Sequence, residues 1–433
     1  MAGTRQESRE DLGLFELIAM GVGGMIGGGI FSVLGLAVGI AGHAAPLAFG
    51  IGSLIALAAG YSYVRLALTY RNDGASFTYL EHAFPKRPNV AGVVGWAIVV
   101  GYIGTLALYA FTFGAYGADL LGKPHSTVLR MALSAAVLGF FMLVNLGGAR
   151  ASGKTEDLVV YAKVLLLAVF AVAGFTSVRP DYLTPVLDKG VASVFMAGAL
   201  IFVAYEGFEL ITNGVCETRN AERNIPRGIY GSIVITSAIY IILAVVGIGN
   251  LTLPKLVAAE EYALAAAAQP VLGKAGTVLV GLAALLATSS AINATSFGAA
   301  RMMAEMAREA RLPKAFSFRS KMDVPWVAVV VLTSLALLFT MAGGLEIIAA
   351  FSSLTFLLVS IGVSVANLRL HAHTNCRIGL VVLGLGLMAA TALLLVIYLW
   401  RSSPGTLIWI GAIYGAVLVA EFIFSERRVG WRR

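Results

Sequence analysis

Long apolar runs separated by short polar connections are the feature that most limits how this chain can fold. Such runs lie at about 14–41, 44–70, 91–121, 127–147, 158–178, 191–215, 228–251, 271–300, 325–343, 346–367, 378–400 and 406–424. A helix needs about 20 apolar residues to cross the hydrocarbon core of a bilayer. Only 12% of the residues are charged, about half the usual share in a soluble domain. The sequence therefore predicts an all-α polytopic membrane protein with about 12 transmembrane helices, surrounded by a lipid bilayer.

The positions of lysine and arginine predict which side of the membrane each connection occupies. With the N-terminus inside, 23 of the 31 basic residues fall in cytoplasmic segments, seven in outer segments, and Lys163 inside a span. Cytoplasmic loops carry such an excess of basic residues. We therefore predict a multi-pass protein of the cell (plasma) membrane, with cytoplasmic ends at 1–13 and 425–433. The first apolar run is too long for a signal peptide, so we expect it to be retained.

Several classes of function find no support in the sequence. The basic residues form no contiguous arm, which argues against a nucleic-acid partner. Cys216 and Cys376 lack C-x-x-C spacing, so neither a disulfide nor a metal site is expected. The chain has no H-E-x-x-H, no G-x-S-x-G feeding a triad and no Walker A loop. We therefore predict that the protein is not an enzyme and uses no cofactor.

The first apolar run carries its weakest helix formers at mid-depth. Residues 21–31 read GVGGMIGGGIF, and each glycine costs a helix about 1 kcal/mol relative to alanine. Close helix packing is one explanation, because Gly23 and Gly27 are four residues apart and small residues at that spacing let helices approach. An unwound segment is the other explanation. Unwound backbone is tolerated at this depth only where it is buried in protein or lines a wet cavity.

A second irregular run lies about 180 residues later. Residues 201–214 read IFVAYEGFELITNG, with Glu206 and Glu209 near the middle of an apolar run. Carboxyl groups at this depth have one of two roles. They are structural acids, which are neutral or hydrogen-bonded within the bundle, or they line a solute path. Interrupted spans at matching places in two halves are typical of an inverted-repeat transporter rather than a channel. Freed N–H groups favour a carboxylate and freed carbonyls an ammonium, so a zwitterionic amino acid suits such a pair of breaks.

Motifs at these breaks resemble the amino acid–polyamine–organocation transporter superfamily. GGGIF (27–31) is similar to the family's G-[SA]-G-I-F in the first span. AYEGFE (204–209), followed by CETRNAERNIPR (216–227), is similar to its A-E-E-x-x-N-P-x-R-x-I-P-R, with Cys216 and Ala221 as departures. SSAINATSFGAARMMAEMAREARLPKAF (289–316) resembles its eighth span, and DGASFTYLEHAF (73–84) resembles the loop after its second span.

The resemblance implies a five-plus-five inverted repeat with alternating access to a mid-membrane site. Spans 1–5 would occupy 14–178 and spans 6–10 would occupy 191–367, with spans 1 and 6 broken and two appended helices in 378–424. The substrate carboxylate would meet the N–H groups of Gly27, Gly28 and Gly29. Carbonyls would receive the substrate ammonium, namely those of Met25, Val203, Ala204 and Glu206. Other side chains expected at this site are Ile26, Tyr102, Tyr205 and Asn293.

Lys163 is the one basic residue that we assign to the interior of a span rather than to a side of the membrane. It lies about 9 Å from the end of its helix, a depth from which a lysine can snorkel to the interface. The resemblance implies a different role, because some family members carry a lysine here whose ammonium replaces a sodium ion. Its expected partners are carbonyls near Gly23 and Ile26 and the hydroxyls of Thr288 and Ser289, with Ser290 next in register. A desolvated lysine can lose its proton, so it could couple transport to protons, with sodium as the alternative ion.

These features together predict a secondary active transporter of amino acids that works by alternating access. We expect proton-coupled symport of neutral amino acids with broad specificity. Glu206 leaves an alternative open, because its carboxyl could face a cationic substrate. The protein would then import or exchange cationic amino acids or polyamines. Glu209 matches an acidic position near the family's cytoplasmic gate, and it is expected to act in gating or as a buried structural acid.

Overall fold

The chain folds almost entirely into helices. The structure is a computed structural model that describes residues 12–71, 75–86, 88–148, 153–309 and 311–431. Within these ranges the only extended pairing is a bridge between Leu12 and Thr218. Ten helical stretches in the described residues are long and apolar enough to cross a membrane. The prediction of an all-α polytopic membrane protein is therefore confirmed.

Two shorter apolar helices of the described residues, in the first and ninth predicted spans, are not among these ten stretches. These are α1 (Leu14–Met25), which forms the first half of the first span, and α13 (Trp326–Ala342). The total of twelve spans and the five-plus-five repeat stay predictions. The other helices are α2 (Gly29–Ala41), α3 (Ala45–Thr69), α4 (Ala75–Ala83), α5 (Pro88–Leu120), α6 (Thr127–Leu146), α7 (Gly153–Phe175), α8 (Val191–Leu200), α9 (Leu210–Asn213), α10 (Ala221–Asn250), α11 (Leu253–Ala259), α12 (Ala263–Arg308), α14 (Leu345–Arg369), α15 (His371–Thr374), α16 (Ile378–Ser402) and α17 (Pro404–Trp431).

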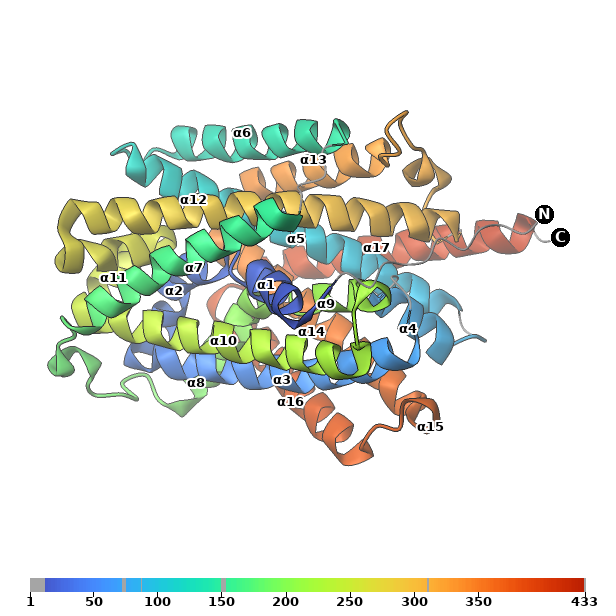
Figure 1. Ribbon diagram of the computed structural model, residues 1–433, viewed down its shortest axis with the longest axis horizontal. Helices are drawn as coiled ribbons and strands as arrows, with labels where there is room; N and C mark the ends of the chain where they lie inside the picture. The colour runs from blue at the N-terminus through green and yellow to red at the C-terminus, as the bar shows by residue number, and fades with distance from the viewer. Residues whose placement is uncertain (1–11, 72–74, 87, 149–152, 310, 432–433) are drawn as a thin grey trace.

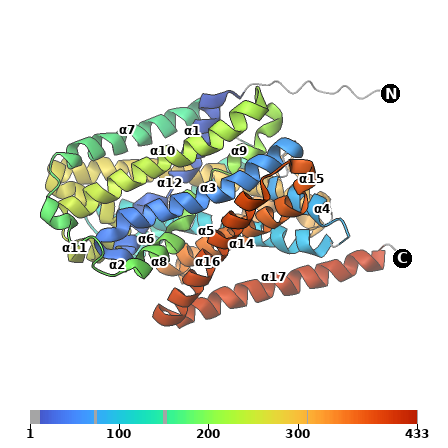
Figure 2. The same cartoon turned by 90° about the horizontal axis from the view of Figure 1, so that it is seen from below.

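The long helices run side by side along the long axis of the molecule (Figure 1). α4 and α15 lie at one end of the bundle, and α11 lies at the other (Figures 1 and 2). We refer to the end that carries α11 as the outer end, following the predicted orientation. α17 extends past the rest of the bundle at the opposite end (Figure 2).

α5 is the central helix, and small residues bring its neighbours close. It packs against α6, α12, α13, α14 and α17. A Cβ on Gly104 would lie 2.5 Å from the hydroxyl oxygen of Ser352 in α14. A Cβ on Gly114 would lie 2.3 Å from the hydroxyl oxygen of Ser134 in α6. Glycine at these positions therefore allows the close helix packing on which association inside a membrane depends.

The glycine-rich stretch of the first span is a real break in the helix. α1 ends at Met25, Ile26 has a non-helical ψ of 62°, and α2 begins at Gly29. The unwound segment is therefore Ile26 to Gly28, in the middle of GVGGMIGGGIF. The sixth predicted span is broken in the same way, because α8 gives way to a 3₁₀ segment, Ile201–Tyr205 (η3), and then to turns before α9. Gly207 lies in these turns with a φ of +124°, a conformation that favours glycine.

Hydrogen bonds join the two broken spans at both of their ends. At the inner end, the N–H of Leu12 donates to the carbonyl of Glu217 at 3.1 Å, and the N–H of Arg219 donates to Leu12 at 2.9 Å. At the outer end, the N–H of His43 donates to Oδ1 of Asp188 at 3.1 Å. The His43 ring nitrogen Nδ1 lies 3.0 Å from the other carboxylate oxygen. These contacts hold the starts and ends of the two spans beside each other.

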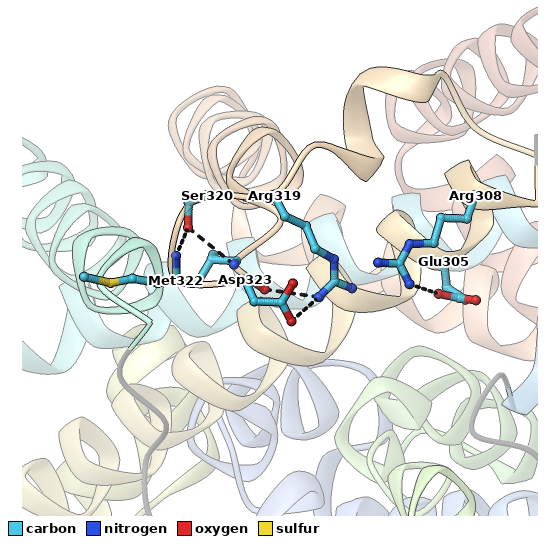
Figure 3. A network of polar contacts seen from close by, with 7 residues as sticks. Glu305, Arg308, Arg319, Ser320, Met322 and Asp323 are labelled. Carbon is cyan, nitrogen blue, oxygen red and sulfur yellow. Dashed lines mark hydrogen bonds and ion pairs between the residues drawn. The ribbon is translucent and has the colours of Figure 1, made fainter. Parts of the chain in front are cut away.

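The polar connection between α12 and α13 is ordered by short-range ion pairs (Figure 3). Arg308 lies 3.3 Å from Glu305 one turn earlier in α12. Arg319 lies 2.8 Å from Asp323, and the hydroxyl of Ser320 accepts the N–H of Met322 at 3.2 Å. Exposed ion pairs of this kind contribute little to stability, so their main effect is to fix the shape of the loop.

Most predicted spans agree with the observed helices within a few residues. The run 44–70 is α3 and the run 346–367 is α14, whereas α12 continues past the predicted limit of 300 to Arg308. α17 makes the predicted tail at 425–433 helical as far as Trp431. Residues 1–11 of the predicted N-terminal segment, residues 73–74 of DGASFTYLEHAF and residues 432–433 lie outside the described residues.

Candidate functional site

A small cavity lies where the two broken spans meet α5 and α12. Its volume is about 30 Å³, which is room for about two water molecules. The charged side chains in its lining are two glutamates from the turns of the sixth span. The lining consists of Met20, Gly23 and Gly24 from α1, Tyr102 and Tyr109 from α5, Glu206, Gly207, Glu209 and Leu210 from the second break, and Ser290, Ala291, Ala294 and Thr295 from α12.

Glycine allows the backbones of the two broken spans to touch beside this cavity. A Cβ on Gly207 would lie 2.5 Å from the carbonyl carbon of Gly24 and 2.6 Å from the nitrogen of Met25. A Cβ on Gly29 would lie 2.7 Å from the Cα of Ala204. No larger residue fits either position without moving the backbone of the other span. Glycines at the two breaks therefore also allow the backbones of the two broken spans to approach each other closely.

The unwound segment of the first span presents unused N–H groups. Among the described residues, the N–H groups of Gly27 and Gly28 meet no hydrogen-bond acceptor. No side chain caps α2, which begins at Gly29, and the first N–H groups of a helix lack partners within it. A Cβ on Gly28 would lie 2.8 Å from the ring of Tyr109, which lines the cavity. The predicted carboxylate donors therefore lie next to the cavity wall.

Tyr240 of α10 joins the carbonyls of both breaks. Its hydroxyl oxygen lies 2.7 Å from the carbonyl oxygen of Met25 and 2.9 Å from that of Ala204. A phenol carries one proton, so Tyr240 can donate to only one of the two carbonyls at a time. Both carbonyls belong to the set that the resemblance assigns to the substrate ammonium. Sequence reasoning missed Tyr240, because a tyrosine within an unbroken apolar helix gives no local signal.

The two glutamates of the second break are bound in different ways. Oε2 of Glu206 accepts a hydrogen bond from the hydroxyl of Thr105 in α5 at 2.6 Å, and the residue is only 5% exposed. Oε2 of Glu209 accepts the N–H of Gly207 at 2.9 Å. Its other oxygen is buried and has no hydrogen-bond partner among the described residues. Two carboxyl groups lining one small cavity give it a negative character that suits a proton or another cation.

Lys163 of α7 reaches the unwound segment of the first span. Its ammonium donates to the carbonyl of Gly23 at 2.8 Å and to that of Ile26 at 2.7 Å. The residue has no exposed surface, so its side chain does not snorkel to the interface. The ammonium therefore supplies donors to carbonyls that the end of α1 leaves without helical partners.

The hydroxyls expected near Lys163 lie on two different faces of α12. Thr288 is fully buried and donates to the carbonyl of Ala284 at 2.7 Å. Ser289 does not line the cavity, whereas Ser290, its neighbour in register, does. α7 and α12 pack directly against each other.

The remaining predicted residues divide between the cavity and its surroundings. Tyr102 lines the cavity, whereas the hydroxyl of Tyr205 donates away from it to the carbonyl of Phe49 at 2.7 Å. The carbonyl of Val203 accepts the N–H of Glu206 at 3.2 Å. Asn293 does not line the cavity either.

Asn293 takes part instead in a contact between α12 and α6. Its side-chain oxygen accepts a hydrogen bond from Asn145 at 3.1 Å. Thr295, two residues further along α12, lines the cavity instead. The helix therefore turns Asn293 toward α6 while it turns Ser290 and Thr295 toward the broken spans.

Comparison with known proteins finds permeases that are similar to this chain along nearly its whole length. A model of the amino acid permease family matches residues 12–420. The chain is 30% identical over 426 residues to the inner membrane transport protein YbaT of Escherichia coli, an alignment that covers 96% of this chain and 97% of the relative. It is 24% identical over 443 residues to the branched-chain amino acid permease BcaP of Bacillus subtilis, covering 97% and 94%.

An uncharacterized protein of Methanocaldococcus jannaschii is 31% identical over 416 residues, covering 96% of this chain and 95% of the relative. Such agreement over nearly the whole length extends well beyond the motifs at the breaks. Together with the family match, it shows that the resemblance noted in the sequence is one of descent. The chain therefore belongs to the amino acid permease family, within the amino acid–polyamine–organocation superfamily of membrane transporters.

Proposed function

We propose that this permease is a proton-coupled symporter of neutral amino acids, with broad specificity, that works by alternating access. The observation that carries the proposal is the pair of hydrogen bonds from Lys163 to Gly23 and Ile26, at 2.8 and 2.7 Å. An ammonium at this place provides a positive charge where a sodium-coupled carrier would need a bound ion. We therefore assign coupling to the proton that Lys163 carries.

The charge of Lys163 controls how firmly the first span is held at its break. Hydrogen bonds from a charged donor are roughly twice as strong as those from a neutral one. A protonated Lys163 therefore clamps the carbonyls of Gly23 and Ile26, and loss of the proton weakens the clamp. α1 is a separate helix of 12 residues that ends at this break, so it can pivot when the clamp is released.

Substrate binding would use the groups that the two breaks leave free. The N–H groups of Gly27 and Gly28 are donors for a carboxylate, and the carbonyls of Met25 and Ala204 are acceptors for an ammonium. A cavity of about 30 Å³ is far smaller than a typical small-molecule site, so the spans must move apart to admit a substrate. The relative from Bacillus subtilis is named for branched-chain amino acids, which are neutral zwitterions, and this favours neutral substrates here.

Uptake into proteoliposomes tests the coupling. Labelled L-leucine should accumulate when the outside is more acidic than the inside, in sodium-free buffer. Lys163→Met keeps the apolar length of the side chain but removes its charge, and it should abolish the dependence on the pH gradient. Lys255→Met, at an exposed lysine of α11, is the matched control and should behave as the unaltered protein.

Two outcomes would overturn the proposal. One is uptake that requires sodium and ignores the pH gradient. The other is a Lys163→Met protein that still accumulates leucine in proportion to the gradient. An exchanger would be recognised by uptake that depends on unlabelled amino acid inside the vesicles rather than on either ion.

Glu206 supports a second candidate, an importer or exchanger of cationic amino acids or polyamines. Its carboxyl lines the cavity beside that of Glu209, so a substrate with a second ammonium would find two acids there. A thermal-shift panel of the twenty amino acids and putrescine, repeated with Glu206→Gln, separates the candidates. Stabilisation by arginine, lysine or putrescine that Glu206→Gln removes selectively would favour the second candidate over the first.

A further inference from the structure

A wider cavity lies at the outer end of the molecule, separate from the central site. Its volume is about 350 Å³. It is lined by Asp119 of α5, by Tyr262 just before α12, and by Ala266, Gln269, Lys274 and Thr277 in the first part of α12. α12 bends at Gly273, where φ is +61°, and the bend separates a short arm from the long part of the helix. Figure 1 shows this end of α12 beside α11, at the opposite end from α4.

An acid, Asp119, and a base, Lys274, line this cavity. Oδ2 of Asp119 is buried and has no hydrogen-bond partner among the described residues. Within the same part of the chain, neither Asp119 nor Lys274 takes part in an ion pair. Buried polar groups in proteins nearly always have a partner, so the unpaired carboxylate oxygen of Asp119 needs an explanation. The ammonium of Lys274 is exposed at the same cavity, where it can meet a ligand.

The arginine whose charge acts on Asp119 makes its hydrogen bonds with other residues. Arg130 of α6 lies 3.1 Å from Oε1 of Glu261, and its Nε donates to the carbonyl of Pro124 at 2.7 Å. These contacts hold the start of α6 against the connection before α12. Arg130 therefore pairs with Glu261, and among the described residues it forms no ion pair with Asp119, although its charge acts on that carboxyl.

We propose that this outer cavity is a second binding site, which takes a free amino acid as a small zwitterion. Asp119 receives the ammonium and Lys274 receives the carboxylate. Gln269 and Thr277 offer neutral hydrogen bonds, and the ring of Tyr262 provides an apolar wall. An acid alone would select a cation and a base alone an anion, whereas both together select a molecule that carries both charges. A volume of about 350 Å³ lies within the range of small-molecule sites.

The site would hold an amino acid at the outer end before it reaches the central cavity. The headgroup of phosphatidylethanolamine also pairs an ammonium with an acidic group, so it shares the chemistry of the proposed ligand. The test must therefore distinguish a free amino acid from this lipid, and the outer site from the central one.

Protection of a cysteine in the cavity tests the proposal on the full chain. Gln269→Cys is exposed at the cavity wall, and Cys216 and Cys376 are replaced by alanine so that only this thiol reacts. The protein is held in phosphatidylcholine nanodiscs and treated with a charged maleimide. L-leucine should slow the labelling, whereas 4-methylpentanoate and 3-methylbutylamine, which each lack one charge of leucine, should not.

Neutralising either charge should weaken the protection. Asp119→Asn and Lys274→Gln should each raise the half-protecting concentration of leucine by about fivefold, the effect of losing one partly exposed ion pair. Lys255→Gln, on the neighbouring helix α11, is the matched control and should leave that concentration unchanged. Labelling that leucine does not slow, or an unchanged half-protecting concentration in the Asp119→Asn Lys274→Gln double variant, would overturn the proposal.

Two further arms identify the ligand and its site. Gly28→Val places a bulky side chain against Tyr109 at the central site, so protection that persists in this variant belongs to the outer cavity. Protection lost with Gly28→Val in a protein that elutes as a folded species would show that the central site causes it, and would refute the outer site. Protection by phosphatidylethanolamine nanodiscs without any effect of leucine would assign the cavity to the lipid and likewise refute the proposal.

Discussion

The hydroxyl of Tyr240 lies 2.7 Å from the carbonyl oxygen of Met25, at the end of the first half of a broken span. The same hydroxyl lies 2.9 Å from the carbonyl of Ala204 in the second broken span. Its ring is held by edge contacts with Phe49 and Tyr205, at centroid distances of 5.6 and 5.4 Å. One proton serves two acceptors, so one carbonyl always lacks a donor that a substrate ammonium could supply.

Tyr240→Phe should therefore destabilise the substrate-free protein. The substitution keeps the ring contacts and removes only the hydroxyl. The buried carbonyls of Met25 and Ala204 then lose the hydrogen-bond donor that they share. Leaving a buried acceptor unsatisfied costs about 1–3 kcal/mol. We expect a lower thermal unfolding midpoint in detergent and a larger rise of that midpoint on adding substrate, because the ammonium then replaces the missing donor.

Tyr161→Phe is the matched control for this substitution. Tyr161 lies on α7 and is 59% exposed, so removing its hydroxyl should change neither midpoint. An unchanged midpoint in Tyr240→Phe, with an unchanged response to substrate, would contradict the role assigned to the hydroxyl.

Gly207→Ala should disrupt the contact between the two breaks. The residue has a φ of +124°, and an added Cβ would lie 2.5 Å from the carbonyl carbon of Gly24. Strained backbone of this kind costs about 1–3 kcal/mol before the clash is counted. We expect a lower unfolding midpoint and loss of labelled leucine uptake in proteoliposomes.

Gly298→Ala provides the comparison within a regular helix. Gly298 lies inside α12 and has nothing within 4 Å of an added Cβ, so alanine should stabilise the helix by up to about 1 kcal/mol. Full uptake by Gly207→Ala would show that the close approach of the two breaks is not needed for transport.

The sequence predicted the parts of this molecule that depend on local patterns. Apolar length marks the spans, and glycine marks the breaks, because a run such as Gly27 to Gly29 weakens a helix wherever it lies. The partners of Lys163 were also expected, since the resemblance places its ammonium near Gly23 and Ile26. The structure adds that Gly24 and Gly207 are in contact, a relation between two breaks that neither segment reveals by itself.

The rest of the site depends on how separate helices are rotated against each other. Successive residues of a helix point about 100° apart, so a register error of one residue moves a side chain to another face. Asn293 was expected at the pocket, yet Ser290 and Thr295 line it. Thr105 could not be anticipated either, because its contact with Glu206 joins positions 101 residues apart.

Thr105 and Glu206 should be coupled in stability. The hydroxyl of Thr105 donates to the carboxyl of Glu206 at 2.6 Å in a buried setting. Thr105→Val keeps the shape of the side chain and removes this donor. In a double-mutant cycle with Glu206→Leu, which removes the acceptor, we expect a coupling energy of about 0.5–3 kcal/mol, as is usual for residues in one hydrogen bond. Additive effects within about 0.3 kcal/mol would contradict a direct interaction in the membrane.

Removing the charge of Lys163 should loosen α1 and open the central cavity. Hydrogen bonds to charged groups contribute about 1.5–3 kcal/mol each, and Lys163 makes two such bonds to the carbonyls at the end of α1. A Met20→Cys reporter in the cavity lining, with Cys216 and Cys376 replaced by alanine, measures the opening. Lys163→Met should raise its maleimide labelling rate by about tenfold or more, because 1.4 kcal/mol corresponds to a factor of ten. Lys255→Met should leave the rate unchanged, and an equal rate in Lys163→Met would mean that the ammonium does not hold the first span closed.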